Sequence, residues 1–271
     1  MANIRFGCQT YTWQMSGEKY LDRLRHIMGV AVRAGFSGFE PEVQFLKDLI
    51  DPAKMREELQ TQKIHLAAVC LVEDWLNPQE MEREKTNADT VIAFLKHFPD
   101  TVLCTCQMPG KDRNDLRDRQ ANLLACVNDV SRRAADQGIT CAYHPNSPLG
   151  SIYRTADDYD ILLNSLDESV TGWAPDVGHI AKGGMDPIVK MKDYRPLITH
   201  VHYKDMTQNG TWAQMGEGII DFRKITSFLR DTGYQGWLIV EDECNRAEAD
   251  PDGVTLEDGL YIKEKLLDGL C

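Results

Sequence analysis

Four strand-like segments in the second half of the chain each end with a side chain that can bind a metal ion. These side chains are His144, Asp176, His202 and Glu241, and they lie 32, 26 and 39 residues apart. Each interval fits roughly one strand plus one helix. In a (β/α)8 barrel the C-terminal ends of the strands converge on one mouth, where the chemistry takes place. Two imidazoles and two carboxylates there would suit Mn²⁺, Zn²⁺ or Co²⁺.

Each of these residues also has a simpler explanation when it is taken alone. A single histidine in a strand is more often a hydrogen-bonded residue than a metal ligand. Asp176 could instead cap the helix that follows it. Glu241 lies too far from the next predicted helix, near Thr255, for that role. All four occupy matching positions at strand ends, and this favours the metal site.

The elements that must position these residues alternate along the chain. Hydrophobic runs predict eight strands: 4–11, 36–40, 64–71, 101–106, 139–144, 170–176, 198–203 and 236–241. Helical periodicity and capping signals predict helices over 18–34, 51–60, 81–98, 115–137, 155–164, from 186 onwards, 221–230 and 255–267. Strict alternation implies a parallel sheet, and eight units close into a barrel. We therefore expect an α/β protein with one (β/α)8 TIM barrel domain over residues 1–271.

A doubly wound sheet is the rival fold, and it would carry a glycine-rich phosphate turn after the first strand. Here that turn reads Gln9-Thr10-Tyr11-Thr12-Trp13. The missing glycines therefore favour the barrel.

Composition limits the class of protein and its partners. The 271 residues carry a net charge of −12, which argues against non-specific nucleic-acid binding. No apolar run is long enough to span a membrane, and the first residues do not read as a signal peptide. The eight cysteines lie mostly in apolar runs and are expected to be reduced thiols. We therefore expect a cytoplasmic protein without membrane or nucleic-acid partners, and a homo-oligomer is compatible with the sequence.

Several motifs together resemble the xylose-isomerase-like sugar (phosphate) isomerase/epimerase superfamily. They are Asp176-Val-Gly-His179, His200-Val-His202-Tyr-Lys204-Asp205, Gly216-Glu-Gly-Ile-Ile-Asp221-Phe222 and Gly236-Trp-Leu-Ile-Val-Glu241. The segment Tyr143-His144-Pro145-Asn146 and the tail from Trp237 to Glu243 are most similar to the inosose (2-keto-myo-inositol) dehydratase branch. The resemblance covers nearly the whole chain in element order, and its specific motifs lie between residues 139 and 243.

The resemblance implies one divalent metal ion, Mn²⁺ first and Zn²⁺, Co²⁺ or Mg²⁺ next, held by His144, Asp176, His202 and Glu241. The epimerases of this superfamily carry a glutamate where this chain has His144. Their two ligand glutamates also act as opposed bases, so Glu241 is the remaining carboxylate of that pair. This difference favours a reaction with one base, such as elimination of water, although an imidazole could still serve as a second base.

Other polar residues complete the predicted site. His179 and Lys204 are candidate catalytic groups, although His179 could be an ordinary loop residue and Lys204 could pair with Asp205. Glu40, His200 and Trp13 are candidate substrate-binding groups. Capping or solvation is the alternative for Glu40, and packing is the alternative for Trp13.

The expected function is enolisation of an unphosphorylated keto sugar or cyclic ketopolyol, leading to isomerisation, epimerisation or loss of water. An inosose dehydratase or a keto-glycoside lyase is the narrower form of this prediction. A phosphate is not expected, because Gly216-Glu217-Gly218 has an acidic centre with few nearby cations. A DNA-repair endonuclease on the same barrel would need further ligands at strands two to four and a basic surface facing DNA. Strand three ends with Cys70-Leu71 and strand four with Cys106-Gln107, so these ligands are missing. A non-catalytic sugar-binding barrel is the other alternative, and metal analysis would distinguish it.

Overall fold

A computed structural model describes residues 4–267, and the chain divides into two compact units. The first unit comprises Met1–Ala67 and Val201–Cys271, and the second comprises Ala68–His200. Each unit contains a parallel sheet whose strands are joined through helices, as expected for consecutive β/α units. A single domain over residues 1–271 remains a prediction.

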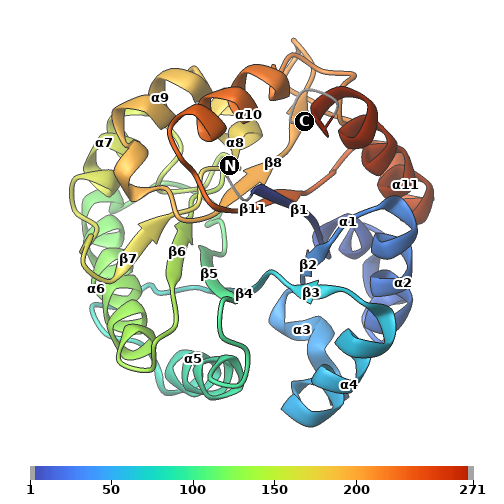
Figure 1. The fold of residues 1–271 in the computed structure, drawn as a ribbon. Helices are drawn as coiled ribbons and strands as arrows, with labels where there is room; N and C mark the ends of the chain where they lie inside the picture. The colour runs from blue at the N-terminus through green and yellow to red at the C-terminus, as the bar shows by residue number, and fades with distance from the viewer. Residues whose placement is uncertain (1–3, 268–271) are drawn as a thin grey trace. The chain divides into compact units, whose positions relative to one another are not determined.

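The sheet of the first unit has five strands, all paired in parallel (Figure 1). In sheet order they are β3 (His65–Leu66), β2 (Gly38–Glu40), β1 (Ile4–Gln9), β11 (Gly236–Val240) and β8 (Val201–Tyr203). At Gly38 a Cβ atom would lie 2.5 Å from the ring of Trp237, so the close packing of this sheet requires glycine. The register places Ile239 of β11 opposite His202 of β8.

The sheet of the second unit has four parallel strands. In order they are β4 (Ala68–Glu73), β5 (Val102–Gln107), β6 (Cys141–His144) and β7 (Thr171–Trp173). One of its buried clusters consists of small and sulfur-containing side chains: Ala68, Cys70, Val102, Cys104, Cys106, Ala142 and Ala174. The register places Cys106 opposite His144, at the C-terminal ends of their strands.

Helices connect the strands in both units. In the first unit they are α1 (Tyr11–Gln14), α2 (Leu24–Ala34), α3 (Val43–Leu46), α4 (Pro52–Gln62), α10 (Phe222–Asp231) and α11 (Pro251–Tyr261). In the second unit they are α5 (Glu82–Leu95), α6 (Leu116–Ala135), α7 (Ala156–Leu163), α8 (Val177–Lys182) and α9 (Pro187–Asp193). Helices α2 and α11 pack against each other (Figure 1). A π-helical segment, Ile262–Leu267, continues α11.

Local capping signals correctly predicted the starts of three helices, α4, α7 and α9. Asp51 accepts a hydrogen bond from the backbone N–H of Ala53, with Pro52 in the first turn. Thr155 and Asp158 form a reciprocal capping box. Asp186 caps α9 in the same way as Asp51 caps α4. These three predictions are confirmed.

All eight predicted strands have counterparts among residues 4–267, but several boundaries were wrong. The predicted strand 64–71 is two elements, β3 and β4, which pair in different sheets. The predicted helix 18–34 begins only at Leu24, after a short 3₁₀ turn at Gly17–Tyr20. Helix α8 and the antiparallel pair β9 (Asp205–Met206) and β10 (Trp212–Ala213) were not predicted. These elements have two to six residues, too few to produce a recognisable period.

The sequence predicted that the cysteines are reduced thiols, and the structure shows their state. The seven cysteines within the described part of the chain are free and buried. Burial raises the pKa of Cys126 and of Cys141 to about 12.

Between residues 4 and 267, no helix combines the length and the apolar character needed to span a bilayer.

Candidate functional site

In the first unit, two predicted site residues, Glu241 and Glu40, contact the imidazole of a third, His202. The Nδ1 atom of His202 lies 2.8 Å from Oε2 of Glu241, and its Nε2 atom lies 3.2 Å from Oε2 of Glu40. All three side chains are buried. Burial alone lowers the pKa of His202, but the charges and hydrogen bonds of Glu40 and Glu241 outweigh it and raise this pKa well above its usual value. The ring and the two carboxylates therefore form a buried ionic cluster.

Lys204 extends this cluster along the same edge of the sheet. Its Nζ atom donates to Oε1 of Glu241 at 2.7 Å and also to Glu243. The ammonium lies 5.2 Å from the ring centroid of Trp212, within cation–π range. The side chain of Lys204 is buried. Lys204 therefore pairs with Glu241 and Glu243 rather than with its sequence neighbour Asp205, whose partners are backbone N–H groups.

Asp205 instead binds the backbone of the glycine-containing loop that follows. Its Oδ2 atom accepts from the N–H groups of Gly216 and Gly218, both at 2.9 Å. Its Oδ1 atom accepts from Met206 at 2.8 Å and from Ile220 at 3.2 Å. A carboxylate of the protein thus occupies the position at which this loop's amides could have bound an anion.

In the second unit, His144 is the last residue of β6 and lies close to Asp176, which follows the end of β7 by three residues. The Nε2 atom of His144 lies 3.6 Å from Oδ2 of Asp176, and both residues are buried. The thiol of Cys106 lies beside His144, and burial raises its pKa. An imidazole and a carboxylate are thus again in close proximity.

Asp176 also caps helix α8, the alternative that the sequence left open. Its Oδ1 atom accepts from the backbone N–H of His179 at 2.8 Å. The imidazole of His179 meets the ring of His144 edge-on, with centroids 5.6 Å apart. Its Nδ1 atom lies 2.7 Å from Oγ of Ser147. His179 is therefore next to the predicted ligands of this unit rather than in a distant loop.

The other two predicted substrate-binding residues are also buried. His200 lies just before β8 and is fully buried. Trp13 is fully buried in α1, and its indole N–H donates to Oδ1 of Asp252 at 2.7 Å. Stacking on a sugar requires an accessible ring face, so this placement fits the packing role left open for Trp13.

The donor atoms of both units suit a divalent ion of borderline softness. Each unit contributes one buried imidazole and one buried carboxylate from the predicted ligand set, and all four residues are among the buried groups that could hold a metal ion. Nitrogen and carboxylate oxygen are common ligands of Mn²⁺ and Zn²⁺. The residue types and their burial therefore fit the expected ion.

Three further polar residues were not predicted. Ser147 contacts His179, Glu243 contacts Lys204, and Glu42 is a buried carboxyl two residues beyond the end of β2. Burial is the main cause that raises the pKa of Glu42 to about 7. Each lies two or three residues beyond the end of a strand, and this position in the sequence could have been used to predict them.

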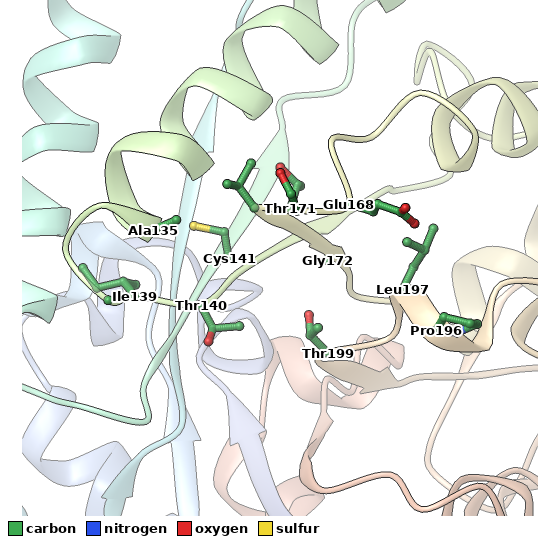
Figure 2. Close-up of a pocket in the computed structure, with 13 residues that line it drawn as sticks. Ala135, Ile139, Thr140, Cys141, Glu168, Thr171, Gly172, Pro196, Leu197 and Thr199 are labelled. Carbon is green, nitrogen blue, oxygen red and sulfur yellow. The ribbon is translucent and has the colours of Figure 1, made fainter.

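A separate cavity of about 360 Å³ lies in the second unit (Figure 2). Thr140 and Cys141 at the start of β6, and Thr171 and Gly172 at the start of β7, are among its thirteen lining residues. None of the predicted site residues lines it. In TIM barrels the N-terminal ends of the strands serve stability rather than catalysis. We therefore do not place the chemistry in this cavity.

Curated relatives are named inosose dehydratases. The protein from Clostridium beijerinckii is 32% identical over 157 residues, which is 51% of this chain and 52% of that protein. The protein from Lacticaseibacillus casei is 28% identical over 163 residues, 54% of each. The matches thus span about half the length of these relatives.

Solved structures share the fold along nearly the whole chain. A probable 3-DHS dehydratase, AsbF, from Bacillus anthracis has a TM-score of 0.75 and 16% identity, covering 96% of this chain and 99% of that one. A D-allulose 3-epimerase from Methylomonas sp. has a TM-score of 0.76 and 18% identity, covering 98% and 100%. The IOLI protein, solved with a zinc atom, has a TM-score of 0.76 and 15% identity, covering 98% of each.

The family's sequence profile matches residues 28–265. This match confirms both the family that the motifs predicted and the α/β barrel fold that the alternating elements predicted. The chain belongs to the xylose isomerase-like TIM barrel family.

Proposed function

We propose that this protein is a divalent-metal-dependent enzyme that removes a proton next to the carbonyl of an unphosphorylated keto sugar or cyclic ketopolyol. The observation that carries the proposal is the buried cluster of His202, Glu241 and Lys204, which combines a metal-type ligand, a carboxylate and a cation. Relatives named inosose dehydratases support the substrate class. Loss of water is the outcome that we favour.

The proposed ligands of the ion are His144, Asp176, His202 and Glu241. Each lies within three residues of the C-terminal end of a parallel strand (β6, β7, β8 and β11), and strand ends of a barrel face one mouth. When bound, a divalent ion would polarise the substrate carbonyl as a Lewis acid. Mn²⁺ remains our first choice, and Zn²⁺ is the second because the IOLI protein was solved with zinc.

Glu241 is the proposed base. Its two carboxylate oxygens accept hydrogen bonds from His202 and Lys204, and these bonds hold the carboxylate in one orientation. Lys204 could donate a hydrogen bond to a substrate oxygen in exchange for its bond to Glu241 or Glu243. The epimerases carry a glutamate where this chain has His144, so Glu241 is the remaining carboxylate of the pair of opposed bases, which favours elimination over epimerisation.

The preference for an unphosphorylated substrate rests on Asp205. The amides of the Gly216–Gly218 loop would be the natural anion cradle at this position, and they donate to the carboxylate of Asp205 instead. A phosphate group would have to displace a buried, four-fold hydrogen-bonded carboxylate. This would cost free energy on the order of several charge-assisted hydrogen bonds.

Metal content tests the ligand set. Purified protein should carry close to one divalent ion per chain, and His202→Ala should lose it, because a missing ligand removes both a bond and the site's geometry. His97→Ala, at an exposed position outside the cluster, is the matched control. Full metal occupancy in His202→Ala, by elemental analysis, would refute the assignment.

Turnover in D₂O tests the reaction. The metal-loaded enzyme should be screened by NMR against ketoses, inososes and 3-keto-glycosides. Elimination should release one water and place one solvent deuterium in the product. Deuterium exchange at one carbon without loss of water would instead identify an isomerase or epimerase. Absence of both, in protein with its metal bound, would favour a non-catalytic barrel.

A further inference from the structure

Tyr11 is a half-buried residue at the C-terminal end of the sheet in the first unit. It follows the last residue of β1 by two positions, and its backbone N–H donates to Oε1 of Gln9. Strand β1 pairs in parallel with β2 and β11, which lead to Glu40 and Glu241. Tyr11 therefore lies at the same end of the sheet as these two buried carboxylates.

Two hydrogen bonds hold the segment on either side of Tyr11. Before it, Oγ1 of Thr10 accepts from the backbone N–H of Glu42 at 3.0 Å. After it, Oγ1 of Thr12 accepts from the backbone N–H of Asp242 at 3.2 Å. Both threonines are buried. Tyr11 is thus anchored between the loop that follows β2 and the residue that follows the proposed base.

The phenol of Tyr11 lies near the ionic cluster of the first unit. Burial and the charges of Glu243 and Glu241 raise its pKa to about 12, and the charge of Lys204 opposes this rise. Such effects require proximity, because charge–charge interactions weaken with distance and are screened by water and salt. Between residues 4 and 267, no group forms a hydrogen bond with the hydroxyl of Tyr11, so this hydroxyl is available to a ligand.

Loss of water needs a proton donor as well as a base. The proposed base removes a proton from the carbon next to the carbonyl, and the hydroxyl on the following carbon must then leave. Hydroxide is a poor leaving group, so a positioned acid that protonates this oxygen accelerates the step. A phenol is protonated at neutral pH even at its usual pKa of about 10. Tyr11 therefore brings such a proton to the neighbourhood of Glu241.

We propose that Tyr11 is a catalytic residue that donates a proton to the hydroxyl that leaves the substrate. This role rests on the proposed function and deepens it. Glu241 gains the proton next to the carbonyl, and the electron pair of that C–H bond forms the C=C bond. The C–O bond breaks, and its electron pair takes the proton of Tyr11, so that water departs. The phenolate then recovers a proton from solvent and Glu241 returns one, which leaves the enol and one water as net products.

Tyr11→Phe separates the two halves of this reaction, because it removes the hydroxyl and keeps the ring. The probe is 2-keto-myo-inositol in D₂O, replaced by the keto sugars of the screen if wild type leaves it unchanged. NMR follows deuterium exchange next to the carbonyl and loss of water in metal-loaded enzyme. Tyr11→Phe should lose water roughly 10²–10⁴-fold more slowly than wild type and should keep the exchange. Tyr20→Phe, the same change at a buried position in the next turn, is the matched control.

An analogue with fluorine in place of the leaving hydroxyl tests the proton donor directly. Fluoride is the anion of a much stronger acid than water, so it leaves without a proton. Wild type and Tyr11→Phe should therefore release fluoride at similar rates, measured by ¹⁹F NMR. If Tyr11→Phe slows the release of fluoride as much as that of water, the phenol acts through structure or binding, and the proposal is wrong.

The outcomes distinguish the role of Tyr11 from the proposed function. Loss of water at the wild-type rate in Tyr11→Phe would refute the role of Tyr11 alone. Wild type that exchanges deuterium without losing water would also refute this role, while the proposed enolisation would stand. Wild type that does neither with its metal bound would refute the proposed function, and the role of Tyr11 with it.

Discussion

Glu42 should make the stability of this protein depend on pH near neutrality. Its carboxyl group is buried and accepts a hydrogen bond from Gln44 at 2.7 Å. Burial raises its pKa from 4.5 to about 7, Gln44 opposes this rise, and the charges of Glu241 and Glu40 add to it. The folded protein therefore binds a proton at Glu42 more tightly than the unfolded chain does. This stabilisation is present in full below pH 4.5 and is lost as the pH rises through about 7.

The size of the effect follows from the two pKa values. At 1.36 kcal/mol per pH unit, the difference between 4.5 and about 7 corresponds to about 3 kcal/mol of unfolding free energy. Most of this loss should occur between pH 5 and pH 8. Glu42→Gln has nearly the same shape, can keep the hydrogen bond with Gln44 and is neutral throughout. We therefore expect Glu42→Gln to be more stable than wild type at pH 8 by about 2–3 kcal/mol, and by less than 1 kcal/mol at about pH 5.

Urea denaturation at several pH values between 5 and 8 measures this difference. The experiment is done with EDTA, because a bound cation would stabilise the charged carboxylate and lower its pKa. Glu217→Gln removes the same charge at an exposed position and controls for net charge. If wild type and Glu42→Gln lose stability with pH along the same slope, Glu42 does not titrate in this range, and the reasoning from its burial is wrong.

Two further substitutions probe the base and the loop. Glu241→Gln keeps an oxygen ligand but cannot accept a proton, so turnover should fall by roughly 10²–10⁴ while metal content stays near wild type; unchanged turnover with metal bound would place the base elsewhere. Asp205→Asn places an NH₂ group against backbone N–H donors, so the unfolding free energy measured in urea should fall by on the order of 2 kcal/mol. Asp231→Asn, at an exposed position, is the control and should leave the unfolding free energy nearly unchanged. Equal midpoints for these two variants would contradict the anchoring role of Asp205.

The parts of the fold that could be predicted are those with a local cause. Asp51-Pro52 and Asp186-Pro187 start helices through a side-chain cap and a fixed proline φ, and both are encoded within three residues. The break of the third strand at Ala67 was not predictable, because it depends on which neighbour each half pairs with. Helix α8 and the β9–β10 pair are too short for a pattern and depend on contacts made after folding.

The pairing of Lys204 could not be predicted from its neighbours in the sequence. Asp205 is its neighbour in sequence, yet Lys204 binds Glu241, 37 residues away. The register explains this choice: Ile239 lies opposite His202 in parallel strands, so two residues further along Glu241 comes opposite Lys204. Strand alternation predicts that His202 and Lys204 share a face. Only the register predicts which carboxylate they meet.

Asp176 shows why capping and ligation need not compete. The sequence presented them as alternatives, because one carboxylate was assigned one task. In the structure, Oδ1 accepts the backbone N–H of His179 at 2.8 Å, whereas Oδ2 lies 3.6 Å from Nε2 of His144. The cap fixes the orientation of the carboxylate, and that orientation directs the second oxygen toward the imidazole. A helix that begins at the residue after Asp176 therefore supports a ligand at this position, since the bond that starts the helix also restricts the rotation that would misplace the other oxygen.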